Sequence, residues 1–540
     1  MHPCLQIEEM LELICEATRF ASSAPRYSEY SAVYALQRTC QTLRVPATKI
    51  LWNTLPGLVP LLLTLPDDLL EDVKDPNLDN FSITQRVLTF RRVASDSDWE
   101  RFDYYAAFVR QMGNSLRKLK FSTKSITFDD EIVRQLEMRS KSKALLPNLN
   151  KIVLQPGKYI QPPSLLRNPS VLLSSSVHSL QLRLDSHHIT DIVRVVDAIA
   201  SLHLSLKCLR LATHSSSWTH DLQDAIFPAF LSLLKNANLE EFESDWLILS
   251  RDSKMMETLF QMPALQKLHI LTDIPVLAHT LDVFPLSEPR LKKVVIRTSN
   301  ISPSHLPQIL SNMRASLLES LIFYQAYFPS TLFSRDDLLQ LLFAITQHCS
   351  PQYLKDLRLP VDMSGFPPSR VRALGVCIDY ILLHPLLTFS NLRCIILHDN
   401  PPDFGDAEVR DLAMSWPLLE TLIFNAFIPP DFRPRTTLKC LLWFAIYCPN
   451  LEKLSFTFDA TGPVENFDGD SEFLTAASES CNRLPHLSVG DSPIAEPDRV
   501  AAFVGSVFPK LSTLKYSEDY YSVVSMRDMW AQVSAKVAKR

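Results

Sequence analysis

Glycine is scarce in this chain, and its scarcity removes the loops that most often bind phosphate groups. The 540 residues include only 10 glycines, and neither Gly-x-Gly-x-x-Gly nor Gly-x-x-x-x-Gly-Lys occurs. The zinc-protease pattern His-Glu-x-x-His and the hydrolase pattern Gly-x-Ser-x-Gly are absent as well. Because no catalytic constellation is found, we expect a protein that is not an enzyme and that needs no cofactor.

Paired cysteines, excess basic charge and long apolar runs are missing too. The 10 cysteines form no Cys-x-x-Cys pair and follow no basic, apolar leader, so we expect reduced thiols in an intracellular protein of the cytoplasm or nucleus. A net charge of −5 argues against a general nucleic-acid binder. The most apolar stretches, 58–65 and 376–389, are too short and too interrupted to span a membrane. His187 and His188 stand alone, so no metal site is expected.

What the chain does contain is a repeat, Leu-x-x-Leu-x-Leu or an apolar variant of it, that recurs on average about every 30 residues. The 14 copies begin at Leu116, Leu149, Val177, Leu206, Leu239, Leu265, Leu291, Leu318, Leu354, Leu392, Leu419, Leu451, Leu484 and Leu511. A fixed period of this size predicts a stack of similar units, each buried by its neighbours.

Each copy ends in four residues that alternate between apolar and other side chains, which is the pattern of a half-buried strand. Segments 336–349, 407–416, 437–448 and 497–508 have helical spacing instead. Strand and helix in alternation predict an α/β fold, with a parallel sheet and the helices outside it. The chain resembles leucine-rich repeat proteins, and steps of 26 to 38 residues predict an uneven solenoid.

The first 55 residues differ from the repeats and predict three short helices, at 7–17, 32–43 and 46–52, the last with Pro46 near its start. Three helices of this length bury little apolar surface, so they favour contact with a partner. Apolar side chains lie at helical spacing in each one. They are Ile7, Met10, Leu11 and Ile14, then Val33, Leu36, Cys40 and Leu43, then Ile50, Leu51 and Trp52.

This segment resembles the F-box, through the apolar-acid-acid-apolar-Leu opening of 7–11, the Leu36-x-x-Thr39-Cys40 step and the Leu51-Trp52 ending. The resemblance implies docking on the Skp-type adaptor of a cullin–RING ubiquitin ligase. The implied adaptor-binding residues are Leu5, Ile7, Met10, Leu11, Ile14, Val33, Leu36, Cys40, Leu43, Leu51 and Trp52. An F-box followed by such repeats resembles a large family of mushroom-forming fungi, in which a segment like Asp98-Trp99-x-Arg101-Phe102 follows the box.

We therefore predict three parts: an F-box-like helical module at 1–55, a helical linker or cap at 56–113, and an irregular leucine-rich-repeat solenoid of about 14 repeats at 114–540. The function expected from the resemblance is a non-catalytic substrate receptor of a ubiquitin ligase. The alternative is an interaction scaffold with no link to ubiquitin, in which 1–55 only cap the solenoid and hide its apolar edge.

A protein substrate would bind the concave face, where the outward strand residues of a solenoid lie. Several of these are basic, which favours an acidic or phosphorylated ligand. They are Lys118, Lys120, Arg183, Arg210, His269, Arg297, Arg358 and Lys515. The competing interpretation is ordinary solvated strand residues, since acidic neighbours such as Glu241 and Asp356 are close in sequence.

Overall fold

The structure of the chain is a computed structural model. In it the chain forms two compact units, Met1–Leu249 (unit 1) and Ser250–Arg540 (unit 2). The structure describes residues 7–20, 29–74, 86–113, 126–154, 168–184, 189–213, 220–246, 253–286, 288–298, 305–325, 335–359, 378–397, 402–424, 433–462, 484–516 and 524–538. Within these residues, no helix is both long and apolar enough to cross a membrane.

Unit 1 is built on parallel strands that pair in chain order. They are β1 (Thr54–Leu55), β4 (Gln111–Met112), β6 (Lys151–Leu154), β7 (Ser179–Leu184), β8 (Cys208–Thr213) and β9 (Glu241–Ser244). One apolar position is held in register across all of them, and each side chain there is at most 5% exposed. The residues of this ladder are Leu55, Met112, Ile152, Leu180, Leu209 and Phe242. Burial of this shared position is what stacks the strands.

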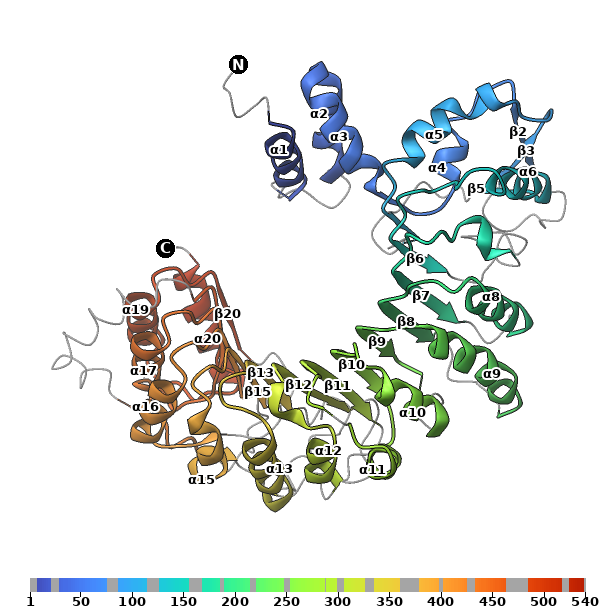
Figure 1. Cartoon of the computed structure of the whole chain (residues 1–540). Coiled ribbons are helices and arrows are strands. Elements are labelled where there is room, and N and C mark those ends of the chain that lie inside the picture. The colour runs from blue at the N-terminus through green and yellow to red at the C-terminus, as the bar shows by residue number, and fades with distance from the viewer. Residues whose placement is uncertain are drawn as a thin grey trace. The chain divides into compact units, whose positions relative to one another are not determined.

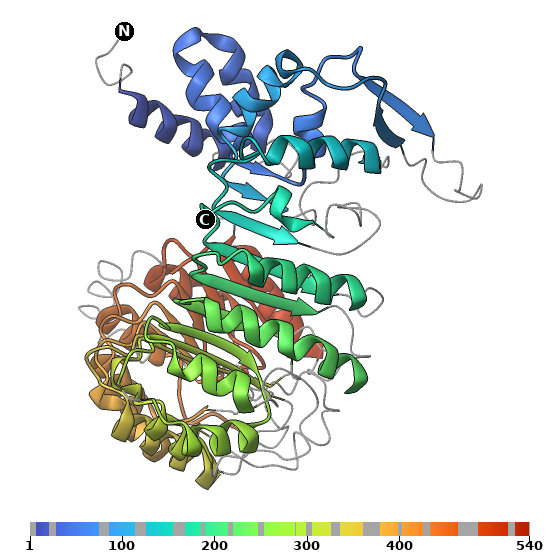
Figure 2. The same cartoon turned by 45° about the vertical axis from the view of Figure 1, so that its right-hand side comes forward.

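The remaining elements of unit 1 are helices, two 3-10 turns and a second, smaller sheet. The helices are α1 (Glu8–Phe20), α2 (Glu29–Thr39), α3 (Gln41–Asn53), α4 (Val59–Leu62), α5 (Glu100–Ala106), α6 (Asp130–Ser140), α8 (Ile189–Ser201) and α9 (His220–Asn236), with 3-10 turns η2 (Asp96–Trp99) and η3 (Pro169–Val171). A separate small sheet contains β2 (Leu70–Lys74), β3 (Arg86–Phe90) and β5 (Ile126–Phe128). Helices α8 and α9 lie beside one another and cover one side of the strands (Figures 1 and 2).

Unit 2 repeats the same plan. Its parallel strands are β10 (Lys267–Leu271), β11 (Lys293–Thr298), β12 (Ser320–Gln325), β13 (Asp356–Leu359), β15 (Cys394–Leu397), β17 (Thr421–Ile423), β18 (Lys453–Ser455), β19 (His486–Ser488) and β20 (Thr513–Lys515). The apolar ladder here consists of Leu268, Val294, Leu321, Leu357, Ile395, Leu422, Leu454, Leu487 and Leu514. The strands follow the inner side of this unit and the helices its outer side (Figure 1).

The outer helices of unit 2 bury apolar side chains on the outer side of the ladder. They are α10 (Ser253–Gln261), α11 (Ile274–Val283), α12 (Leu306–Asn312), α13 (Arg335–His348), α15 (Tyr380–Leu383), α16 (Asp406–Ser415), α17 (Cys440–Tyr447), α19 (Pro497–Val507) and α20 (Val524–Val537), with η7 (Ala315–Leu317), η8 (His384–Thr388) and a two-stranded sheet of β14 (Ile378–Asp379) and β16 (Pro402–Asp403). Helix α17 is apolar over almost its whole surface. Two buried tryptophans form hydrogen bonds to backbone that is distant along the chain. Trp416 Nε1 donates to the Leu386 carbonyl at 3.1 Å, and Trp530 Nε1 donates to the Ser492 carbonyl at 2.7 Å.

The leucine-rich-repeat architecture predicted from the sequence is confirmed. Of the 14 copies of the repeat, the 13 from Leu149 onward each end in a strand of the parallel sheets, while the copy at Leu116 lies outside the described residues. The predicted helices at 336–349, 407–416 and 497–508 correspond to α13, α16 and α19, and the one at 437–448 contains the shorter α17.

The predicted boundary at 114 needs correction, because the apolar ladder already begins at Leu55 and Met112. The stretch 56–113 is also not a purely helical linker, since it contains β2, β3 and β4. Only the first half of the repeat marks β4, since Val109 and Met112 are apolar and three residues apart but Asn114 stands where the third apolar residue is expected. Strands of two residues, such as β1 and β4, are too short to show an alternating pattern.

Candidate functional site

The first three helices form a small module with its own core (the N-terminal module, α1 to α3). Cys15, Val33 and Ala47 are fully buried at its centre. The half-buried side chains packed against them are Leu36, Leu43, Ile50 and Leu51. Lys49 forms ion pairs that join α3 to α1. Its Nζ lies 2.5 Å from Glu8 Oε1 and 2.6 Å from Glu12 Oε1. The charged face of α1 is thereby oriented toward α3.

Helix α1 leaves an apolar stripe in solvent. Ile7 is 48% exposed, Met10 39% and Ile14 38%. Ile7 directly precedes α1, and its carbonyl accepts from the Leu11 N–H at 3.2 Å. The three residues are spaced three and four apart, so they lie on one face. Leu11 and Cys15 lie on the adjacent face and are buried. An exposed apolar stripe on a charged helix is typical of a surface that binds another protein.

Two of the predicted adaptor-binding residues need correction. Leu11, which is 5% exposed, and Val33, which is fully buried, pack inside the module and cannot contact a partner while it stays folded. The arrangement of the helices explains this, because successive residues rotate by about 100° around a helix and only one side of α1 meets α2 and α3. Leu5 lies outside the described residues.

The other predicted residues hold the module together or lie at its edge. Trp52 is half-buried, and its ring stacks on Tyr105 with centroids 4.2 Å apart. Cys40 is exposed at the N-cap of α3. Leu43 belongs to α3 and not to the second helix, and Pro46 lies inside α3 and not at its start. The chain turns between helices at Cys40, earlier than the apolar spacing indicates.

The sequence pattern missed other exposed apolar side chains of the module. Leu13 on α1 is 63% exposed, and Tyr34 on α2 is 53% exposed beneath the Arg38 guanidinium, which lies 5.7 Å from its ring centroid. Each falls off the apolar stripe of its own helix, which is why helical spacing did not select it.

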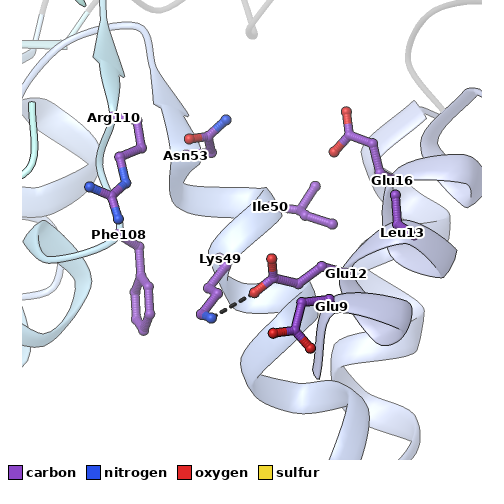
Figure 3. Close-up of a pocket in the computed structure, with 9 residues that line it drawn as sticks. All are labelled: Glu9, Glu12, Leu13, Glu16, Lys49, Ile50, Asn53, Phe108 and Arg110. Atoms are coloured by element: carbon purple, nitrogen blue, oxygen red, sulfur yellow. Dashed lines mark hydrogen bonds and ion pairs between the residues drawn. The ribbon is translucent and has the colours of Figure 1, made fainter. Parts of the chain in front are cut away.

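A cavity of about 590 Å³ opens between α1, α3 and the segment before β4 (Figure 3). Its lining residues are Glu9, Glu12, Leu13, Glu16, Lys49, Ile50, Asn53, Phe108 and Arg110. The carboxylates come from α1, while Phe108 and Arg110 form the opposite wall (Figure 3). The backbone N–H of Arg110 donates to the Asn53 carbonyl at 2.9 Å, which holds that wall against α3. This lining can bind charged and apolar groups but includes no histidine, cysteine or hydroxyl nucleophile.

The segment between β3 and α5 is anchored by a buried carboxylate, that of Asp98. Arg92 Nη1 lies 2.6 Å from Asp98 Oδ2, and the Ser95 backbone N–H and hydroxyl both donate to that oxygen at 2.7 Å. Next to it, Trp99 is buried beneath the Arg139 guanidinium, 4.9 Å from its ring centroid. The bonds from Arg92 and Ser95 hold the pKa of Asp98 well below its usual value.

We expect Asp98→Asn to lower the thermal midpoint at pH 7 and to weaken the loss of stability on acidification. Because the folded pKa of Asp98 lies below its unfolded value of about 4, its contribution is complete above that value and is lost as pH falls toward the folded pKa. Thermal unfolding at pH 7 and pH 3 measures both effects. Asp67→Asn, at an exposed carboxylate, is the control; equal midpoints for the two variants would contradict the anchoring role.

The predicted basic row on the strands is largely neutralised. Arg210 Nη2 lies 2.6 Å from Glu241 Oε1 and its Nε 3.2 Å from Glu243 Oε2. Arg358 Nε lies 2.8 Å from Asp356 Oδ1, which raises the pKa of the Arg358 guanidinium. Both arginines are therefore compensated within the chain, which favours the competing interpretation of ordinary strand residues at these two positions. The acidic residues near them in sequence are also near in space.

The other predicted residues of this row are spread over both units. Arg183 is in β7, His269 in β10, Arg297 in β11 and Lys515 in β20. Lys118 and Lys120 lie outside the described residues. The sequence pattern missed that the strand position occupied by His269 and Arg358 is apolar on several other strands of unit 2. These positions are Val295, Ile322, Ile396 and Ile423.

The described part of the chain shows no cluster of metal-binding side chains, and two of its thiols are held in the protonated form by burial. No group of three His, Cys, Asp or Glu side chains there could hold an ion, and His187 and His188 lie outside it. Burial raises the pKa of the Cys349 and Cys394 thiols to about 12, so both are protonated at neutral pH.

No protein-family profile and no curated protein matches the chain. Among solved structures, it is similar to a chain of the Rad7–Elc1 complex of yeast, at 12% identity and a TM-score of 0.34, over 73% of this chain and 93% of that one. It is also similar to a chain of the TLR13–ssRNA13 complex, at 13% identity and a TM-score of 0.28, over 78% of this chain and 61% of that one. At these scores, neither similarity bears on function.

Proposed function

We propose that this chain is the non-catalytic substrate receptor of a cullin–RING ubiquitin ligase. The N-terminal module would bind the Skp-type adaptor and the repeats would hold a protein substrate, while a separate enzyme transfers ubiquitin. The observation that carries the proposal is the solvent-exposed stripe of Ile7, Met10 and Ile14 on a module that already has its own core. Among the described residues of the module, the stripe lies outside this core, and it offers the apolar centre that protein interfaces need.

A scaffold without any link to ubiquitin is the second candidate, and one contact favours it. Helix α3 runs directly into β1, where Leu55 pairs with Met112 at the end of the parallel sheet of unit 1. The N-terminal module could then serve to protect that sheet edge, as terminal caps do in repeat proteins. In that case the apolar stripe would not be needed for binding.

A pull-down with purified Skp-type adaptor separates the two candidates. Met10→Asp/Ile14→Asp should reduce binding by at least about 30-fold, because two carboxylates would be buried at the centre of the interface. Both side chains are exposed, so the module should keep its fold and its unfolding midpoint. Leu11→Asp is unsuitable, because it would place a charge in the core.

The matched control is Leu13→Asp, on the same helix and 63% exposed, but on the face that lines the cavity. It should bind the adaptor as the native chain does. If the native chain fails to bind, or if the double variant binds equally well, the receptor proposal is wrong and the scaffold remains.

A further inference from the structure

The cavity between α1, α3 and the segment before β4 carries charges of opposite sign on its two walls. Glu9 lies on the α1 wall and Arg110 on the opposite wall (Figure 3). Neither side chain has an ion-pair partner among the residues that the structure describes. Glu12 differs from Glu9, because its carboxylate already lies 2.6 Å from Lys49 Nζ. A ligand in the cavity therefore meets the Glu9 carboxylate on one side and the Arg110 guanidinium on the other.

Apolar side chains form another part of the lining. Leu13 is 63% exposed, and Ile50 and Phe108 are half-buried, so all three are accessible to a molecule in the cavity. The volume of about 590 Å³ falls within the range of about 300–1,000 Å³ found for sites that bind small organic molecules. An apolar lining with a few charged groups is also typical of such sites.

Both walls are held in place without a ligand. On the α1 side, the ion pairs of Lys49 join α1 to α3. On the opposite side, the Arg110 N–H donates to the Asn53 carbonyl at 2.9 Å. The ring of Phe108 packs edge-to-face with that of Tyr104, and their centroids are 5.2 Å apart. A cavity whose walls are already fixed loses little conformational entropy when a ligand binds.

We propose that this cavity binds an amphipathic zwitterion, a compound whose cationic and anionic groups are joined by an apolar body. The cation contacts Glu9, the anion contacts Arg110, and the apolar body covers Leu13, Ile50 and Phe108. Both ionic contacts are charge-assisted hydrogen bonds, and they strengthen when the body of the ligand excludes water. A free ω-amino acid and a protein segment with one basic and one acidic side chain share this chemistry.

Ligand-observed NMR titration of the full chain tests the proposal. The probes are ω-aminohexanoate, ω-aminooctanoate and ω-aminoundecanoate, which differ in the distance between their charges. Each is compared with the alkylamine and the alkanoate of the same chain length. The best zwitterion should bind at least about tenfold more tightly than either singly charged probe, because it forms one more charge-assisted contact. Its binding should also weaken as the salt concentration rises.

A second set of probes identifies the source of the ligand. It contains the peptides Gly-Lys-Phe-Glu-Gly and Gly-Lys-Ala-Phe-Ala-Glu-Gly, each compared with versions in which lysine or glutamate is replaced by glutamine. Tighter binding of the peptides than of the ω-amino acids would indicate a protein segment, and the reverse would indicate a free compound. If no probe of either set needs both of its charges for binding, the proposal is wrong.

Exchange of the two charges supplies the matched variants. Glu9→Lys should weaken binding of the zwitterion at least about tenfold, because a like charge then faces its cation. Glu9→Lys/Arg110→Glu should restore binding, because the same ligand can bind in the reverse direction. Glu100→Lys is the control, since Glu100 is exposed on α5 and does not line the cavity. A control that weakens binding as much as Glu9→Lys, or an exchange that fails to restore it, would contradict the proposed site.

This inference does not depend on the receptor proposal, because the cavity and the apolar stripe lie on different faces of α1. Met10→Asp/Ile14→Asp should therefore still bind the zwitterion after it has lost the adaptor. A chain that binds the adaptor but none of the zwitterionic probes would refute this inference alone. A chain that binds a zwitterion but not the adaptor would refute the receptor function alone.

Discussion

Replacing Gly113 by alanine should destabilise unit 1 by about 3 kcal/mol or more. Gly113 has φ +78°, a conformation that residues with a side chain adopt only at a cost. A Cβ atom built there would lie 2.3 Å from the Val153 carbonyl oxygen. That oxygen belongs to the backbone of β6 and cannot rotate away, so the strands themselves would have to separate.

The position of Gly113 explains why the effect should spread. Its N–H donates to the Leu55 carbonyl at 2.8 Å, and the preceding residue, Met112, pairs with both Leu55 and Ile152. Strain at this point therefore acts on β1, β4 and β6 together. Urea unfolding followed by circular dichroism measures the decrease in the free energy of unfolding.

The control for that experiment is Gly462→Ala. No heavy atom lies within 4 Å of the Cβ that this change would add, so the free energy of unfolding should change by less than about 0.5 kcal/mol. If Gly113→Ala unfolds at the same urea concentration as this control, β4 is not packed against β6 in the way described.

Replacing Phe456 by alanine should cost unit 2 about 3–5 kcal/mol, which is typical of a large aromatic side chain removed from a core. Phe456 is 1% exposed and is surrounded by three other rings. Its centroid lies 5.6 Å from that of Phe444, 5.9 Å from Phe424 and 6.2 Å from Phe404. These rings come from different repeats, so the vacated space cannot be filled by a small local shift.

Two further variants separate cavity formation from loss of an aromatic ring. Phe456→Leu retains most of the volume and should cost less than half as much. Phe343→Ala removes the same side chain from a position that is 50% exposed, and its effect should be small. Equal denaturation midpoints for Phe456→Ala and Phe343→Ala would show that the aromatic cluster does not stabilise unit 2.

Much of the fold could be predicted because the repeat records a physical requirement at regular intervals. Each strand must bury the same apolar position against its neighbours, so residues such as Leu209 and Leu357 mark their strands in the sequence. The short strands β1 and β4 escaped prediction because two residues cannot show periodicity. Their place in the ladder depends on neighbours that are distant along the chain.

The candidate sites were predictable only in part, for a different reason. Helical spacing identifies residues on a shared face, but it does not say which side of that face another helix will cover. On α1 the apolar arc runs from Met10 through Ile14 and Ile7 to Leu11 and Cys15, and α2 and α3 bury only its last part. The division between core and exposed stripe was therefore a tertiary outcome.

The sequence by itself determined the repeat, the parallel sheet with outer helices and the presence of a distinct helical segment before the repeats. Tertiary structure alone decided which charges are compensated. Strand register places Arg210 beside Glu243, whereas it places Lys293 opposite Ser320 on β12. Register is a relation between strands some 30 residues apart, so two basic residues that look equivalent in sequence can differ in whether a carboxylate lies opposite them in the sheet.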